Sequence, residues 1–310
     1  MRTTIPPSEV QKAASLRFEK VRAARLSVLS NSFLVIAKLI IGLYMGSVAV
    51  ISEAIHSATD LIAAIIAFVA VRASDAPPDE LHPYGHGKVE SISGVGEALL
   101  IIAAGCYILF EAVRALITGK QSENLGWGVS VMAVSAVINF FVTRYLFYVA
   151  RKTDSLALEA DAHHLNVDVW TSVGVAIGLT LAWITGLWWL DPAVALFIAA
   201  FILWTGGQIF RNAFAPLLDE RLPPHEIDSI IGIMNSHPEV LDWHQLRTRK
   251  SGSLRHMDVH IQVDDDMSLR DAHQLTEELE DQMRDALPNM SVLIHTEPYE
   301  EERRHREAAH

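Results

Sequence analysis

Cysteine is almost absent from this chain of 310 residues, because Cys106 is the only one. A single cysteine cannot form a disulfide within the chain, and a metal site built from several thiolates is excluded. An excess of positive charge is also absent. The formal net charge is −12, which argues against nucleic acid as a partner. The first 25 residues contain no apolar core, so we expect no cleavable signal peptide.

Long apolar runs, in contrast, are abundant. A helix that crosses the hydrocarbon core of a bilayer needs about 20 mostly apolar residues. Six runs meet this requirement, at about residues 26–46, 48–71, 91–117, 126–149, 164–187 and 190–214. The sequence therefore predicts a polytopic α-helical membrane protein with six transmembrane helices. We expect the first of these helices to act as the insertion signal.

Basic residues predict the orientation of these helices. They gather before the first run, after the second and after the fourth: Arg17, Lys20, Arg22, Arg25, Arg72, Lys88, Arg144, Arg151 and Lys152. The loops on the opposite side carry little positive charge, and basic loops stay in the cytoplasm. We expect both termini to be cytoplasmic, in a multi-pass protein of the bacterial cytoplasmic (inner) membrane.

A second domain is predicted after the last apolar run. Residues 222–238 and 267–287 have helical patterns, and Ser268 is a suitable N-cap. Residues 240–250 and 254–263 resemble two strands joined at Ser251-Gly252, and residues 290–298 a third strand. The αββαβ order predicts a small α+β domain with its helices on one sheet face. We divide the chain into an N-terminal cytoplasmic segment, a six-helix domain, an α+β domain and a charged tail, at 1–23, 24–216, 217–300 and 301–310.

The same polar pair occurs in two of the apolar runs. His56 and Asp60 are four residues apart, and so are His164 and Asp168. Residues at i and i+4 share one helix face, so each helix offers one imidazole and one carboxylate to a neighbour. Each ionisable group near the bilayer centre costs about 2.5–3.5 kcal/mol. One pair alone is equally explained as a polar contact between helices, but two matched pairs supply the four ligands of a tetrahedral Zn²⁺ site.

Two further acidic residues lie near these pairs or in another apolar run. Asp161 is about one turn before His164, where it either lines a cytoplasmic entrance or is an acid favoured by the helix dipole. Glu97 lies inside the third run. It is either a proton relay or a hydrogen-bonded packing residue.

Two histidine-rich groups lie outside the apolar runs. Asp79, His82 and His86 follow a D-x2-H-x3-H spacing in a loop, which either holds one zinc with a water ligand or is simply solvated. The α+β domain supplies His244, His260, His273, His295 and Glu297. His260 and His295 lie on strands that we expect to be neighbours, so they favour a sensor site in which one metal bridges two protomers.

Five stretches together resemble the cation diffusion facilitator family of divalent-metal/proton antiporters. They are "GSVAVISEAIHSATDL", "HPYGHGKVES", "DAHHLNVDVWTS", "LDPAVAL" and "HTEP", and the resemblance extends from about residue 24 to residue 298. It implies six spans, a metallochaperone-like cytoplasmic domain for metal sensing and dimerisation, and a homodimer in membrane lipid.

The resemblance also implies roles for the residue groups above. His56, Asp60, His164 and Asp168 map onto the family's transport site, and Asp79, His82 and His86 onto its loop site. The α+β group maps onto a binuclear site, in which Glu297 replaces the aspartate of a close bacterial member. Lys88 and Asp219 map onto an ion pair that holds the dimer together.

The ligand types favour Zn²⁺ as the transported ion and as the regulatory ligand. Two imidazoles and two carboxylates suit Zn²⁺, and also Fe²⁺ or Co²⁺, whereas Mn²⁺ prefers oxygen ligands. His56 favours Zn²⁺ over Cd²⁺, because family members that accept Cd²⁺ usually have aspartate there. We expect proton-coupled efflux by alternating access. The alternatives are another divalent metal or a metal-responsive scaffold without transport.

An intramembrane metalloenzyme is a further class of protein to consider, but we expect no enzyme activity. Such an enzyme typically needs H-E-x-x-H on a helix. The nearest sequence, "HEIDS" at residue 225, lacks the second histidine and lies outside the apolar runs.

Overall fold

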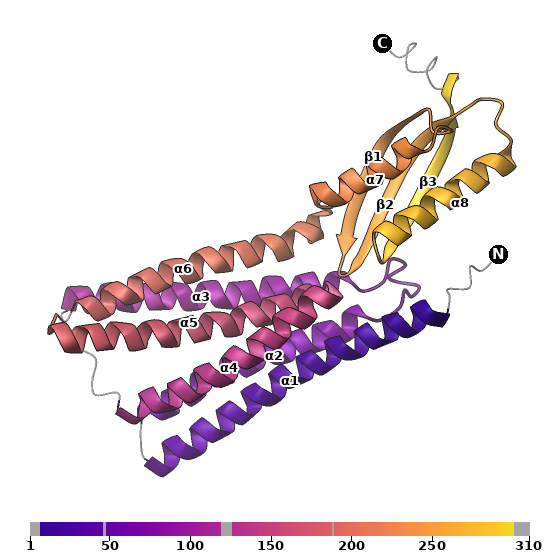
Figure 1. The fold of residues 1–310 in the computed structure, drawn as a ribbon. Coiled ribbons are helices and arrows are strands. Elements are labelled where there is room, and N and C mark those ends of the chain that lie inside the picture. The colour runs from indigo at the N-terminus through magenta and orange to yellow at the C-terminus, as the bar shows by residue number, and fades with distance from the viewer. Residues whose placement is uncertain (1–6, 46–47, 119–125, 188, 301–310) are drawn as a thin grey trace. The chain divides into compact units, whose positions relative to one another are not determined.

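A computed structural model of the chain describes the backbone of residues 7–45, 48–118, 126–187 and 189–300, with most of their side chains. The chain divides into two compact units, Met1–Phe214 and Ala215–His310. The first unit is built from long helices and the second from helices and a sheet (Figure 1). The predicted helical bundle and the αββαβ domain that follows it are confirmed.

The described part of the first unit contains six long helices. They are α1 (Pro7–Met45), α2 (Val48–Ser74), α3 (Lys88–Thr118), α4 (Gly126–Thr153), α5 (Leu156–Thr185) and α6 (Leu190–Phe214). Among the described residues, five of these helices contain stretches long and apolar enough to cross a membrane; α5 carries three acidic residues and is not among the five.

The helices extend beyond the apolar runs at several ends. α1 begins at Pro7, so most of the predicted N-terminal segment is helical, and α5 begins at Leu156. A run of apolar residues in the sequence identifies only the part of a helix that can lie in the hydrocarbon core of a bilayer. The flanking turns contain charged residues and continue the helix past that part, because a helix is limited by its backbone hydrogen bonds and not by its polarity.

Small residues allow the close packing of α3 against α6. A Cβ added to Gly94 would lie 2.9 Å from the Cβ of Ala213, and one added to Gly206 would lie 2.9 Å from Ile102. α5 packs against both helices, and α1 packs mainly against α2 and α4. Small residues at helix contacts are typical of membrane bundles, because they let the backbones approach.

A buried polar network joins four helices at one end of the bundle. The Lys20 Nζ of α1 donates to Glu90 Oε1 at 2.7 Å and to Asp75 Oδ1 at 3.0 Å. Ser74 Oγ, from the end of α2, also donates to Glu90 Oε1. The other oxygen of Glu90 accepts from Ser155 Oγ, just before α5, at 2.7 Å. Glu90, in the first turn of α3, is therefore the centre of the network and is 1% exposed.

The second unit is a three-stranded sheet with two longer helices. After a short 3-10 helix, η1 (Ala215–Leu218), its elements are α7 (Pro224–Ser236), β1 (Asp242–Ser251), β2 (Leu254–Val263), α8 (Leu269–Ala286) and β3 (Met290–Pro298). β1 and β2 form the predicted hairpin, in which Gly252 has a φ of +60°, and α8 crosses over so that β3 lies parallel to β2. Ser268 caps α8, as predicted, by accepting a hydrogen bond from the Asp271 N–H.

The helices and the sheet bury one apolar core between them. Met257, Val259 and Ile261 of β2 are buried together with Leu279 of α8 and Ile230 of α7. Side chains alternate between the two faces of a strand. The residues between these apolar positions, His260 among them, therefore lie on the sheet face away from that core.

Candidate metal centres

Two helices bring the paired histidines and aspartates together inside the first unit. Ligand atoms of His56 and Asp60 on α2 and of Asp168 on α5 all lie within 4.8 Å of one another. His164 Nε2 lies 3.4 Å from Asp60 Oδ1, and His56 Nε2 lies 3.9 Å from Asp168 Oδ1. Each histidine thus contacts the aspartate of the other helix. The i and i+4 spacing on both helices places all four groups at one meeting point.

The atoms at this point are largely buried and only partly satisfied. The side chains of Asp60, His164 and Asp168 are 5%, 11% and 16% exposed, whereas that of His56 is 54% exposed. Among the described residues, neither Asp168 Oδ2 nor His164 Nδ1 has a hydrogen-bond partner. A buried polar atom without a partner costs about 1–3 kcal/mol. The donor set of two imidazole and two carboxylate groups fits a divalent cation that would coordinate such atoms.

Two buried carboxylates lie near the four-residue group. Asp161 and Glu97 are 1% and 0% exposed, and neither Asp161 oxygen has a hydrogen-bond partner in the described part of the chain. Glu97 accepts one hydrogen bond from Ser93 Oγ at 3.3 Å. Because α5 begins at Leu156, Asp161 lies in the second helical turn, beyond the first turn in which the helix dipole acts strongly.

Lys38 is a neighbour of the group that the sequence does not place among the candidate site residues. It lies on α1, is 5% exposed, and donates to Ser57 Oγ at 2.8 Å. Its charge also interacts with Asp168. A lysine in the middle of an apolar run was the available signal, because buried charges in membranes are rare unless they have a partner.

The loop between α2 and α3 forms a second group. His82 Nδ1 lies 3.1 Å from Asp79 Oδ1, and His86 Nε2 lies 3.4 Å from Asp79 Oδ2. The His82 N–H donates to Asp79 at 2.6 Å, and this backbone hydrogen bond is the main cause that holds the pKa of Asp79 below its ordinary value. Gly85 has a φ of +79°, a turn conformation that favours glycine. The carboxylate is therefore ionised and shared by the two imidazoles.

A third group lies on the open face of the sheet in the second unit. The strand register pairs His244 with His260 and His260 with His295, so three histidines form a row across β1, β2 and β3. Glu297 lies next to this row. Its Oε1 is 2.6 Å from His260 Nδ1, and its Oε2 is 3.4 Å from His244 Nε2.

The charge of Glu297 is set by these neighbours. Partial burial raises the pKa of its carboxyl group. The hydrogen bond with His260 and the nearby charges of His244 and His260 lower this pKa, and together they outweigh the effect of burial. The net result is a pKa below the ordinary value. Glu297 is therefore anionic at neutral pH.

One expected ligand, His273, and one expected ion pair, Lys88–Asp219, are not part of these three groups. His273 lies on α8, 3.5 Å from Glu277, and its side chain is 71% exposed. Lys88 begins α3 in the first unit, whereas Asp219 belongs to the second unit and pairs with Arg249 at 3.3 Å. The role of His273 and the Lys88–Asp219 ion pair stay predictions.

Comparison with known proteins identifies both units. The family described as the cation efflux transmembrane domain matches residues 24–218. The family described as the cytoplasmic domain of cation efflux proteins matches residues 222–299. These two matches follow each other along the chain and together include all three groups of candidate ligands.

Individual relatives agree with these matches. The cation-efflux pump FieF of Citrobacter koseri is 32% identical over 277 residues, which are 89% of this chain and 92% of that protein. An uncharacterized transporter of Synechocystis is 33% identical over 257 residues, 83% of either chain. A solved structure described as "Mode of Action of a Putative Zinc Transporter CzrB" is 32% identical and covers 25% of this chain and 98% of its own, with a TM-score of 0.25.

The family assignment decides the class of protein. Members of this family are transporters of divalent metal cations and not enzymes. The chain belongs to the cation diffusion facilitator family and is a multi-pass membrane transporter for the efflux of divalent metal cations.

Proposed function

We propose that the protein exports Zn²⁺ from the cytoplasm in exchange for protons. The observation that carries this proposal is the convergence of His56, Asp60 and Asp168 within 4.8 Å, with His164 3.4 Å from Asp60. Two nitrogen and two carboxylate ligands suit Zn²⁺ better than Mn²⁺. Fe²⁺, Co²⁺ and Cd²⁺ remain alternatives that the same site would bind.

Proton exchange follows from the chemistry of these ligands. A metal binds to the neutral imidazole and the ionised carboxylate, so binding displaces any proton that the ligand carries. When the site opens to an acidic exterior, protons compete for the same atoms and release the ion. Alternating access then requires only that α2 and α5 expose their four ligands to one side of the membrane at a time.

The other two groups are proposed to regulate transport. Asp79, His82 and His86 form a partly exposed loop site that binds one ion, with water completing its coordination. The row of His244, His260 and His295 with Glu297 binds metal when the cytoplasmic concentration is high. We place this domain in a homodimer whose two copies are tightened by the bound metal, with both termini on the cytoplasmic side of the inner membrane.

Flux measurements in reconstituted vesicles test the proposal. With a pH gradient imposed, the wild-type protein should move Zn²⁺ faster than Fe²⁺, Cd²⁺ or Mn²⁺ offered in turn. Asp168→Ala should abolish the flux, because it removes a ligand that the remaining three cannot replace. Glu111→Ala is the matched control, since Glu111 is a partly exposed acid of α3 that pairs only with Arg114 in the described structure.

Two outcomes of this experiment would contradict the proposal. Undiminished flux in Asp168→Ala would exclude the four-residue group as the transport site. Complete absence of metal flux in the wild-type protein would instead favour a metal-responsive scaffold.

A further inference from the structure

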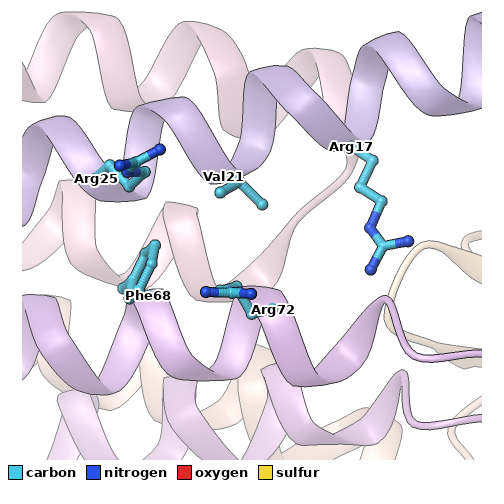
Figure 2. A pocket seen from close by; sticks show the side chains of 5 residues that line it. All are labelled: Arg17, Val21, Arg25, Phe68 and Arg72. Carbon is cyan, nitrogen blue, oxygen red and sulfur yellow. The ribbon is translucent and has the colours of Figure 1, made fainter.

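A basic cavity lies between α1 and α2, and none of the candidate metal ligands is among the residues that line it. It has a volume of about 370 Å³ and is lined by Arg17, Val21, Arg25, Phe68 and Arg72. Figure 2 shows that the first three side chains come from α1 and the other two from α2, and that Arg17 extends from α1 toward α2. Spacings of four residues place each set on one face of its helix.

The positive charge of this cavity is only partly neutralised. Arg17 Nε lies 3.5 Å from Asp75 Oδ2. Among the residues with described side chains, neither Arg25 nor Arg72 has a carboxylate within ion-pair distance. Arg72 instead lies over the Phe68 ring, with 5.8 Å between its Cζ and the ring centroid. The cavity therefore combines three guanidinium groups with an apolar wall and has room for an anion.

A phosphate group is the anion that this arrangement suits. Guanidinium groups bind phosphate oxygens through paired, charge-assisted hydrogen bonds. The volume lies within the range of about 300–1,000 Å³ that is typical of small-molecule sites. A phosphodiester with its glycerol could therefore place its oxygens at the arginines and its carbon atoms against Val21 and Phe68.

The surfaces next to the cavity favour a lipid over a free phosphate ion. On α1, Leu29 and Phe33 follow Arg25 on the same face and are 66% and 61% exposed. On α2, Val69 and Ile65 precede Arg72 on its face and are 57% and 44% exposed. Exposed apolar side chains that continue from a basic cavity along membrane helices would contact acyl chains, while the headgroup occupies the cavity.

We propose that the α1–α2 cavity is a binding site for the phosphate headgroup of an anionic phospholipid. The lipid binds through Arg17, Arg25 and Arg72, and its acyl chains lie along α1 and α2. Because α2 carries His56 and Asp60, a lipid that joins α1 to α2 also stabilises the helix that holds half of the candidate transport ligands. The proposal does not depend on which metal is transported.

Thermal unfolding of the purified full chain in detergent tests this site. Phosphatidylglycerol should raise the Tm of the wild-type protein, whereas phosphatidylcholine and inorganic phosphate should not. In Arg25→Gln/Arg72→Gln the apparent affinity for phosphatidylglycerol should fall about twenty-five-fold, since each basic group contributes roughly a factor of five to the binding of anionic lipid. Arg25→Lys/Arg72→Lys should retain most of the effect, because both charges remain.

Arg144→Gln is the matched control for the loss of an arginine. The Arg144 Cζ lies 6.0 Å from the centroid of the Phe140 ring, which is four residues earlier in the chain, so this contact resembles that of Arg72 with Phe68. Arg144 does not line the cavity. Its response to phosphatidylglycerol should equal that of the wild type. An unchanged response in the Arg25/Arg72 double glutamine variant, or equal stabilisation by phosphatidylcholine, would overturn the proposal. Equal stabilisation by inorganic phosphate would overturn the assignment to a lipid and leave a free-anion site.

Discussion

Exposure differs sharply among the four candidate transport ligands. The His56 side chain is 54% exposed, whereas those of Asp60, His164 and Asp168 are at most 16% exposed. His56 is thus the ligand that can change its chemistry with the least effect on packing. A substitution at this position should alter metal preference before it alters the fold.

We expect His56→Asp to change selectivity and to keep transport. The variant still offers four ligands, but three of them are carboxylates, and oxygen-rich sites suit Mn²⁺ better than mixed nitrogen and oxygen sites do. The ratio of Mn²⁺ flux to Zn²⁺ flux in vesicles should therefore rise. His225→Asp, at an exposed position on α7, should leave the ratio unchanged. An unchanged ratio in His56→Asp would exclude His56 as a selectivity determinant.

Glu297 makes the stability of the metal-free protein sensitive to acid. Its pKa lies below the ordinary value in the folded chain. Its contribution to stability is therefore fully present above the unfolded pKa of about 4.3 and is lost as the pH falls through the lower, folded pKa. The wild-type protein should have a higher Tm than Glu297→Gln at pH 6, and the difference should shrink below about pH 4. A difference that grows on acidification would contradict this account.

At the scale of the helices, the Lys20–Glu90 network links the segments that carry the candidate ligands. Asp75 and Glu90 lie at the two ends of the loop that contains Asp79, His82 and His86, and both contact Lys20. Glu90 also accepts a hydrogen bond from Ser155, just before α5. The network therefore fixes the ends of α2, α3 and α5 around one buried lysine.

We expect Glu90→Ala to destabilise the protein much more than a comparable exposed change. Removing one partner of a buried ion pair typically costs about 3–5 kcal/mol. Glu19→Ala is the matched control, because Glu19 also bonds a lysine of another helix, Lys152, at 2.7 Å, but the two side chains are 34% and 41% exposed. Exposed pairs contribute about 0–1 kcal/mol. Equal losses of unfolding free energy in the two variants would contradict a central role for Glu90.

The sequence predicted the pairing of α2 with α5 but not this network. The i and i+4 repeats identify which residues share a helix face, and a membrane leaves few partners for such groups. In the sequence, Lys20 is only one of several orientation signals before the first apolar run. Its burial depends on contacts with residues 55 and 70 positions further along the chain, and local patterns carry no information about such distant contacts.

In the sheet, too, local features were predictable from the sequence and distant contacts were not. The hairpin and the Ser268 cap followed from local residues. The parallel pairing of β2 with β3 depends on the crossover of α8, and the bulge between His244 and Arg247 changes the register of β1. The convergence of Glu297 on His260 and His244 thus required the tertiary structure, although the histidines themselves were visible in the sequence.

At the scale of the whole molecule, the described residues include three groups of candidate ligands in three structural settings. One is inside the helical unit, one is in the partly exposed loop before α3, and one is on the open face of the sheet. The group inside the helical unit is the one that we propose as the transport site. We therefore propose that the helical unit exchanges Zn²⁺ for protons at its four-residue group.

Simultaneous recording of Zn²⁺ and proton fluxes in vesicles that contain the full chain tests this exchange. With an inward Zn²⁺ gradient and no initial pH difference, we expect Zn²⁺ uptake accompanied by proton movement in the opposite direction, with a constant ratio of the two fluxes. Both fluxes should be lost together in Asp60→Ala. Zinc uptake without any proton movement, or proton-coupled uptake that persists in Asp60→Ala, would contradict the account.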